Sequence, residues 1–308
     1  MNPAALLRLV LLGMIWGASF LFQRVCVPAV GVGMTAASRM LFAAVTLYAV
    51  LLVMRKPLQW RKRWRDYLIV GITASGLPFL LFAFGAGHLP AGYLAVLNAT
   101  VPLFTVLLGW AGGTQPSASK FAGVGVGVLG VFVLAKFGSV EPGWPTVLAF
   151  AAGLGAAVLY SISARAAKAR FPDVDPLVVA GGNMIGGALP LIPVAALSLP
   201  AQLPSLGVIA ALAALGILCT AIAFILFYRL IADIGSERTV TVTFLIPLFA
   251  QTWGALFLGE HVTLASATGC GLVLLAVALI FELVPGFRRT PARVPTPLVA
   301  TPVRQECS

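Results

Sequence analysis

The tripeptide Pro102-Leu103-Phe104 occurs a second time as Pro247-Leu248-Phe249, and each copy lies inside a long apolar run. The two prolines are 145 positions apart, and a shift of 145 aligns residues 71–109 with 216–254 at nine identities. A fixed offset across two consecutive predicted helices is more than apolar composition alone would produce. We interpret it as an internal repeat.

The first two helices of each half agree more weakly, at an offset of 144. That offset pairs Trp16 with Tyr160, Ser19 with Ser163 and Arg39 with Asn183.

A proline inside a helix has no N–H group, so the carbonyl four residues earlier loses its partner and the helix kinks. Here these carbonyls belong to Asn98 and Thr243. Because lipid cannot satisfy a free carbonyl, such a break lies against protein or a water-filled cavity. Interrupted helices at matching positions of two repeats indicate the central site of a transporter. The alternative is a kink that only shapes helix packing.

The composition predicts an all-α integral membrane protein. Sixty per cent of the 308 residues are hydrophobic, nine per cent are charged, and the mean hydropathy is +1.03. A soluble domain carries about 25% charged residues. The net charge of +11 comes from basic residues that cluster between the apolar runs. Their expected partner is therefore the anionic face of a lipid bilayer and not nucleic acid.

Charges, prolines and glycines divide the chain into ten predicted transmembrane helices, each near the 20 or so residues that cross a bilayer. Five spans per repeat is an odd number, so the second repeat enters the membrane inverted. We expect two inverted five-helix repeats, residues 1–138 and 139–284, and then a disordered, basic, proline-rich cytoplasmic tail, residues 285–308. The predicted spans are Leu6–Gln23, Gly33–Met54, Tyr67–Gly87, Ala91–Trp110, Ser119–Phe137, Trp144–Ala164, Pro176–Leu199, Leu206–Leu230, Ser236–Leu258 and Val262–Leu283.

The basic residues also predict the orientation. A cytoplasmic N-terminus places seventeen of the 20 Lys and Arg on the cytoplasmic side. Arg24 and Lys136 then lie outside, and Arg39 lies within a span. By the positive-inside rule, both termini of this multi-pass protein are expected in the cytoplasm, with the chain in the inner (plasma) membrane.

Several short motifs resemble the EamA-type transporters of the drug/metabolite transporter superfamily, and the match extends over most of 9–283. The resemblance implies ten spans in two inverted halves, a central cavity, and movement of small metabolites or toxic amphiphiles, often outward. The first half departs from the family pattern, because Gly113-Thr114-Gln115 stands where a Gly-Glu pair is expected. The motifs are Leu12-Gly-Met-Ile-Trp16-Gly-Ala-Ser19, Arg39, Leu89-Pro-Ala-Gly-Tyr93, both Pro-Leu-Phe copies and Phe257-Leu-Gly-Glu260 followed by Gly269.

The sequence contains no constellation typical of an enzyme. There is no paired intramembrane carboxylate, no His/Cys cluster and no Gly-x-Ser-x-Gly motif. The four cysteines have neither CxxC spacing nor neighbouring histidines. We therefore expect no catalysis, no metal site and no cofactor.

Two charged residues have two interpretations each. Arg39 lies about six residues, or roughly 9 Å, from the outer end of its span. It either pairs with a substrate carboxylate or a gate, or its long side chain snorkels to the outer interface. Glu260 ends the ninth span, and it either gates by pairing with a basic group or is an interfacial charge that starts the next helix. No acidic residue lies at mid-membrane to carry a coupled proton.

The broken helices and their repeat partners supply a predicted cavity lining with aromatic faces and few polar groups. Such a lining suits a small amphipathic solute, an amino acid or related carboxylate or zwitterion, that leaves the cytoplasm. Lipophilic cations are the alternative substrates, a non-transporting structural membrane protein is the alternative class, and the oligomeric state stays open. The predicted lining residues are Trp16, Ser19, Arg39, Phe79, Asn98, Pro102, Tyr160, Ser163, Asn183, Phe224, Thr243, Pro247, Gln251 and Trp253.

The orientation is testable with single cysteines in a cysteine-free background. Cysteines at Gln59 and Lys168 should resist an impermeant thiol reagent applied to intact cells, whereas a cysteine at Gln202 should react. Labelling at Gln59 without labelling at Gln202 would reverse the assignment.

Overall fold

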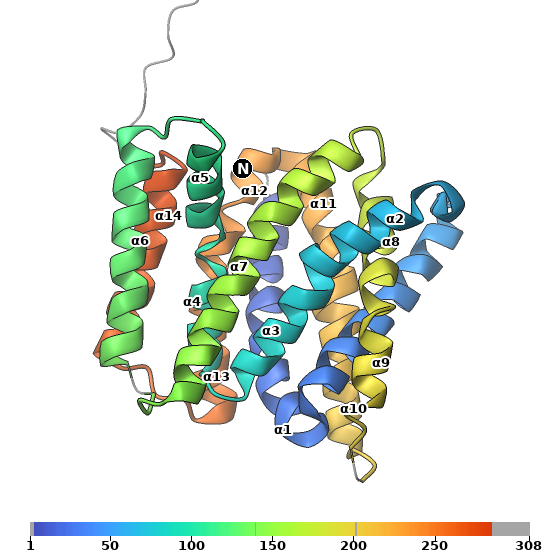
Figure 1. Cartoon of the computed structure of the whole chain (residues 1–308), viewed down its shortest axis with the longest axis horizontal. Helices are drawn as coiled ribbons and strands as arrows, with labels where there is room; N and C mark the ends of the chain where they lie inside the picture. Colours follow the sequence, from blue (N-terminus) through green and yellow to red (C-terminus); the bar gives the residue numbers. More distant parts are fainter. Residues whose placement is uncertain (1–2, 139, 201, 285–308) are drawn as a thin grey trace, which may run out of the picture.

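The computed structural model describes residues 3–138, 140–200 and 202–284. These residues form helices α1–α14 and two π-helical segments, with no strand among them. Six helical segments are long and apolar enough to cross a membrane, and two shorter apolar helices accompany them. The long helices lie side by side in one bundle, with the N-terminus at one end (Figure 1). The expected class, an all-helical membrane protein, is confirmed; the predicted tail lies outside the described residues.

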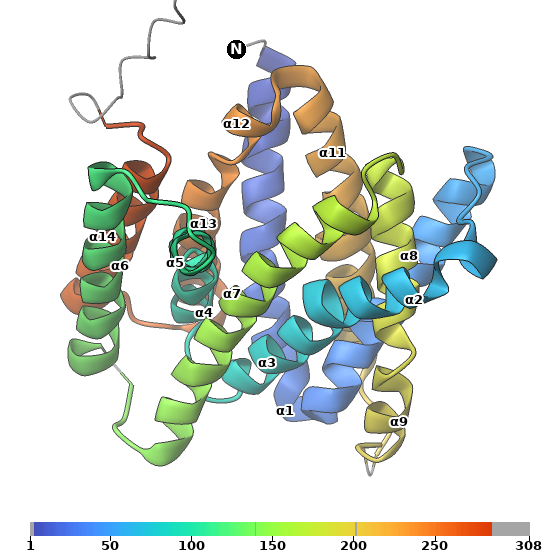
Figure 2. The same ribbon diagram turned by 45° about the horizontal axis from the view of Figure 1, so that its top comes forward.

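The first two predicted spans belong to a single long helix that reverses direction. Helix α1 is Pro3–Val53, 51 residues with Pro28 inside it, and the backbone leaves helical geometry at Gly31 (φ 78°, ψ 169°). A straight helix of that length would reach about 76 Å, far more than the roughly 30 Å of a bilayer core. Gly31 tolerates the positive φ of the turn because it has no Cβ. The two limbs of α1 therefore run in opposite directions, and they diverge from the turn at Gly31 (Figure 2).

The third and eighth predicted spans each contain a π-helical segment. In the third, α2 (Trp60–Gly71) continues through η1 (Ile72–Gly76) into α3 (Leu77–Ala86). In the eighth, α10 (Leu206–Ala213) continues through η2 (Ala214–Ile222) into α11 (Ala223–Ile234). Shifted by 145, η1 falls within η2. Isolated π-helical turns are rare and are frequent at functional sites.

The proline breaks agree with the prediction in the first half only. Helix α4 (Ala91–Asn98) ends and α5 (Val101–Ala111) begins just before Pro102. In the second half, Pro247 lies within α13 (Val242–Leu258), and the chain leaves α12 (Ser236–Thr239) several residues earlier. The predicted match of the two breaks is therefore wrong.

Local hydrogen bonds account for the position of the second break. The hydroxyls of Thr241 and Thr243 donate to the carbonyls of Arg238 and Val240, at 2.7 and 2.8 Å. The backbone N–H of Thr243 also binds the Val240 carbonyl, at 2.9 Å. These tight i→i−3 contacts compete with a regular helix and hold the irregular turn before α13.

Side-chain caps begin most of the remaining helices. Ser117 caps α6 (Ala118–Phe137), Asp175 caps α8 (Pro176–Ala188) and Thr263 caps α14 (Leu264–Ile280). Each side-chain oxygen accepts a backbone N–H of the first turn that has no partner within the helix. Helix α7 spans Trp144–Arg170 and is longer than its predicted span, whereas the short α9 (Leu191–Ala196) continues the segment that α8 begins.

Helix α6 buries three glycines and exposes several large apolar side chains, an arrangement unlike that of a soluble helix. Gly123, Gly127 and Gly130 are buried, whereas Phe121 and Val128 are each 61% exposed. In lipid, small residues let helix backbones approach closely, and large apolar side chains face the acyl chains. This pattern independently supports a membrane location.

The α6–α14 contact generates a stability prediction with a matched control. A Cβ on Gly130 would lie 2.9 Å from Leu272 Cβ and 3.0 Å from the Gly269 carbonyl, whereas one on Gly125 would meet nothing within 4 Å. Gly130→Leu should therefore destabilise the protein by about 1–3 kcal/mol. Gly125→Leu should leave the thermal unfolding midpoint in detergent unchanged. Equal midpoints for the two variants would contradict this packing.

Candidate transport cavity

A cavity of about 470 Å³ lies in the middle of the bundle. Its wall is mainly apolar and includes eight aromatic residues. On one part of it Trp16 contacts Phe224 and Phe227, at ring-centroid distances of 6.3 and 5.3 Å. Aromatic rings give a large apolar surface that binds a flat or bulky apolar body. The aromatic lining residues are Trp16, Phe20, Phe79, Phe82, Tyr160, Phe224, Phe227 and Tyr228.

Ten of the fourteen residues predicted to line a cavity do line this one. They include five pairs related by an offset of 144 or 145 residues, so each half of the chain contributes one member of every pair. The pairs are Trp16/Tyr160, Ser19/Ser163, Arg39/Asn183, Phe79/Phe224 and Asn98/Thr243. Their part in binding a substrate stays a prediction.

The other four predicted residues lie outside the lining of this cavity. The indole Nε1 of Trp253 donates to the Met14 carbonyl at 3.1 Å, and so this side chain fastens α13 to α1. Gln251 packs against Gly92 of α4. Pro102 and Pro247 shape their helices without reaching the wall of the cavity.

Four aromatic residues of the wall were not predicted from the sequence: Phe20, Phe82, Phe227 and Tyr228. Phe82 and Phe227 form one of the nine identities between the repeats, so the repeat carries a signal for this pair.

Arg39 is buried in the wall of the cavity. Its residue surface is 7% exposed, and the guanidinium carbon lies 3.7 Å from the centroid of the Phe79 ring. The Nε–H donates to Thr220 Oγ1 at 3.0 Å. The alternative interpretation, a side chain that snorkels to the outer interface, is therefore wrong.

No carboxylate neutralises Arg39 within the described part of the chain. The four ion pairs of these residues are Arg8–Asp233, Arg24–Glu260, Lys56–Asp175 and Arg170–Asp66. An arginine within a membrane span costs at least about 2.5–3.5 kcal/mol on insertion scales. The cavity therefore presents one unpaired cation that an anionic group can neutralise.

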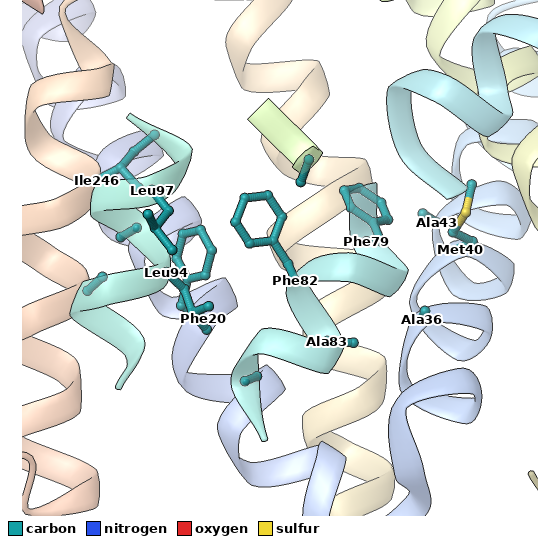
Figure 3. Packing of buried hydrophobic residues seen from close by; sticks show 14 of the residues in the cluster. Phe20, Ala36, Met40, Ala43, Phe79, Phe82, Ala83, Leu94, Leu97 and Ile246 are labelled. Carbon is teal, nitrogen blue, oxygen red and sulfur yellow. The ribbon is translucent and has the colours of Figure 1, made fainter. Parts of the chain in front are cut away.

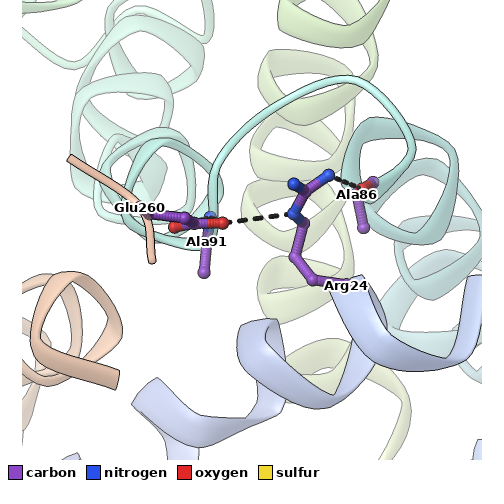
Figure 4. Close-up of polar contacts among 4 residues, drawn as sticks. All are labelled: Arg24, Ala86, Ala91 and Glu260. Atoms are coloured by element: carbon purple, nitrogen blue, oxygen red, sulfur yellow. Dashed lines mark hydrogen bonds and ion pairs between the residues drawn. The ribbon is translucent and has the colours of Figure 1, made fainter. Parts of the chain in front are cut away.

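Glu260 lies at the centre of a polar contact that we call the distal latch, formed by Arg24, Glu260 and the backbone N–H of Ala91. Arg24 Nε donates to Glu260 Oε1 at 3.1 Å, and Ala91 N–H donates to Oε2 at 2.9 Å (Figure 4). Arg24 Nη1 also donates to the Ala86 carbonyl at 2.8 Å. The carboxylate thus joins α1, the first turn of α4 and the α13–α14 loop. Glu260 also pairs with a basic group, Arg24, which is the contact that the predicted gating role requires.

The latch lies on the side of the molecule opposite the N-terminus, which we call the distal side. Arg24 is 21 residues, or about 32 Å, along α1 from Pro3. Between the cavity and the latch, the Phe20 and Phe82 rings meet edge to face at 5.6 Å, with Leu94 and Leu97 in the same buried cluster (Figure 3). An apolar plug and an ion pair therefore close the distal side.

The other three ion pairs lie near the N-terminal end and are more exposed. The side chain of Glu260 is 13% exposed, whereas the acidic partners Asp66, Asp175 and Asp233 are 27–39% exposed. Exposed ion pairs contribute about 0–1 kcal/mol to stability, and the free-energy cost of breaking an ion pair is larger when the pair is buried. The latch is thus the ion pair whose loss should matter most.

Burial raises the pKa of the Glu260 carboxyl above its ordinary value, although the Ala91 N–H and the Arg24 guanidinium act in the opposite direction. The carboxyl therefore takes up a proton at a higher pH than an ordinary glutamate. The charged latch is the high-pH form, and protonation removes its ion pair with Arg24.

Taken together, the structure is a multi-pass helical membrane protein with a central amphipathic cavity that is closed on one side. The chain belongs to the EamA-like transporter family, whose model matches residues 3–136 and again residues 147–282. The expected family membership is thereby confirmed.

Three relatives are named as transporters or exporters. A probable terminal-alkyne amino-acid exporter of Streptantibioticus cattleyicolor is 29% identical, over 94% of this chain and 98% of the relative. The inner membrane transporter YedA of Escherichia coli K12 is 25% identical, over 86% and 87%. A transporter of Archaeoglobus fulgidus is 24% identical, over 76% and 83%.

A solved crystal structure is similar in fold, with a TM-score of 0.63 and 21% identity over 92% of this chain and 98% of that chain.

The latch predicts acid-sensitive access from the distal side. In a cysteine-free background, a cysteine at Ser19 should react slowly with an impermeant thiol reagent outside cells. Because the thiolate is the reactive form, the rate is divided by that of a free thiol at the same pH, and this ratio should increase as the external pH falls. In the Glu260→Gln variant, the cysteine at position 19 should react about fivefold faster at neutral pH. A fivefold increase corresponds to about 1 kcal/mol of lost ion pairing. The control is Glu282→Gln, whose carboxylate accepts from Ser117 Oγ at 2.8 Å, and it should not change the rate. Equal rates for the parent and Glu260→Gln would contradict a gating role.

Proposed function

We propose that the chain is a secondary transporter that exports small amphipathic metabolites, amino acids or related carboxylates and zwitterions, by alternating access. The observation that carries this proposal is Arg39, a buried cation without an acidic partner among the described residues, in a largely apolar cavity whose other described polar lining groups are uncharged. A guanidinium favours a carboxylate geometrically as well as electrostatically, because its N–H groups form a fork that matches the two oxygens.

The lining also restricts what else the cavity accepts. Phosphate esters and multiply charged anions require several buried basic groups, and Arg39 is the one Lys or Arg in the described cavity wall. An amino acid with an apolar side chain fits better, because its carboxylate can reach Arg39 while its side chain lies against rings such as Trp16 and Phe224. The name of the Streptantibioticus relative, which mentions amino-acid export, is consistent with this substrate class.

Lipophilic cations are the second candidate substrates. The aromatic faces of the cavity would suit them through cation–π contacts. The unpaired positive charge of Arg39 opposes them, because like charges in an apolar cavity repel strongly. We therefore rank them below carboxylates, and we rank a purely structural role below both, since a scaffold needs no charged cavity.

Alternating access rests on our further proposal of ten spans in two inverted repeats, residues 1–138 and 139–284. Support comes from the two separate matches of the family model, from η1 and η2, and from the five residue pairs that line the cavity. In such an architecture the two halves exchange conformations around a fixed site. With the distal latch closed, the conformation described corresponds to a cavity that faces the N-terminal side.

The orientation follows from the basic residues, which favour a cytoplasmic N-terminus in the inner membrane. The distal latch then lies outside, and the described state faces the cytoplasm, where an exporter collects its substrate. If transport is coupled to a proton gradient, the carboxylate of the distal latch that would take up the proton is Glu260, whose pKa is raised.

An Arg39→Gln variant separates the two substrate classes. In proteoliposomes, loss of the guanidinium should reduce leucine transport by the equivalent of about 1.5–3 kcal/mol, roughly 10- to 100-fold in the apparent affinity. Ethidium transport should stay unchanged or become faster, because a repulsive charge is removed. Proteoliposomes of the parent protein that move ethidium and none of a panel of apolar amino acids would contradict the proposed substrate class.

A further inference from the structure

We propose that Thr220 is a positioning residue for the substrate carboxylate: it fixes the guanidinium of Arg39 so that the two terminal Nη groups bind the carboxylate end-on. This inference rests on the proposed function and adds the manner in which the site recognises its substrate.

The contact consists of two successive hydrogen bonds through the Thr220 hydroxyl, one from Arg39 of α1 and one inside the π-helical segment η2. Thr220 is 1% exposed. Its hydroxyl donates to the Leu215 carbonyl, five residues earlier, at 2.8 Å. A hydroxyl has one proton to donate, so the oxygen that faces Arg39 can only accept. It accepts the Nε–H of Arg39 at 3.0 Å.

The hydrogen bond to Thr220 determines which N–H groups of the Arg39 guanidinium remain free. A carboxylate can bind arginine side-on, through Nε and one Nη, or end-on, through both Nη groups. Thr220 occupies Nε, and the Phe79 ring covers one face at 3.7 Å. Among the described residues, Thr220 is the sole hydrogen-bond partner of this guanidinium. The end with two Nη groups is therefore left for a ligand.

A close backbone contact between η2 and α1 fixes the position of Thr220 relative to Arg39. A Cβ on Gly216 would lie 2.8 Å from the Arg39 carbonyl oxygen, so η2 and α1 touch at a position where any side chain would push them apart. Thr220 lies one turn beyond Gly216 on η2. The Thr220 hydroxyl is thus held at a fixed position beside Arg39.

The repeat-related position in the other half lacks this polar contact. Offsets of 144 and 145 place Asn183 opposite Arg39 and Ser75 opposite Thr220. Gly71 approaches the Asn183 backbone as Gly216 approaches that of Arg39. However, Asn183 Oδ1 is buried without a hydrogen-bond partner among the described residues. The scaffold is shared by both halves, but the anchored charge is built into one half only, so the cavity has a single end for the head group.

The test is leucine transport in proteoliposomes by Thr220→Val, which keeps the shape but removes the acceptor, with Thr220→Ser as the matched control that retains it. Thr220→Val should raise KM about tenfold and leave Vmax within about twofold, the effect of one lost oriented hydrogen bond. Thr220→Ser should keep the parent KM. Arg39→Gln is measured beside them, and thermal unfolding in detergent reports the folding of each variant.

The outcomes separate this inference from the proposed function. If Arg39→Gln raises KM while Thr220→Val does not, or if Val and Ser are equally impaired, Thr220 has no positioning role. If Arg39→Gln leaves KM unchanged, the proposed substrate site itself is wrong. If Thr220→Val does not reach the membrane, Thr220→Cys replaces it, because a thiol is a weaker acceptor of similar size; equal KM values for Cys and Ser would overturn the inference.

Discussion

The buried charge of Arg39 is the constraint on which the rest of the cavity depends. A guanidinium within a membrane protein needs partners, because desolvation without them is costly. The ring of Phe79 and the hydroxyl of Thr220 satisfy part of this need, and no carboxylate among the described residues supplies the rest. The remainder is available to a substrate. The π-helical segment η2 and the absence of a side chain at Gly216 bring Thr220 close to Arg39.

The two sides of the cavity differ in their packing and in the burial of their ion pairs. On the distal side, the Phe20–Phe82 contact is buried, and the latch joins α1, α4 and the α13–α14 loop through one carboxylate. Near the N-terminus, the ion pairs lie at exposed positions where water competes for each charge. The conformation described is held on the distal side by a partly buried ion pair, and acid favours the breaking of that pair.

The sequence predicts the helical class, the family and ten residues of the cavity wall, because these follow from composition and from matched positions in a repeat. Arg39, Asn98 and Thr243 were found in this way. Contacts between distant segments could not be predicted. Thr220 resembles any other hydroxyl in an apolar helix, and nothing in the sequence pairs Arg24 with Glu260, 236 residues away. The second helix break was misplaced because proline chemistry alone does not account for the threonine hydroxyls that set it.

Counterflow in proteoliposomes tests the central claim most directly, that one cavity with an arginine is exposed alternately to the two sides of the membrane. Vesicles are loaded with excess unlabelled leucine and diluted into a trace of labelled leucine. An alternating-access carrier should accumulate the label transiently above its external concentration, because the outflowing leucine returns the cavity to the labelled side. Label that rises only to equilibrium, or uptake equal to that of protein-free vesicles, would contradict the account.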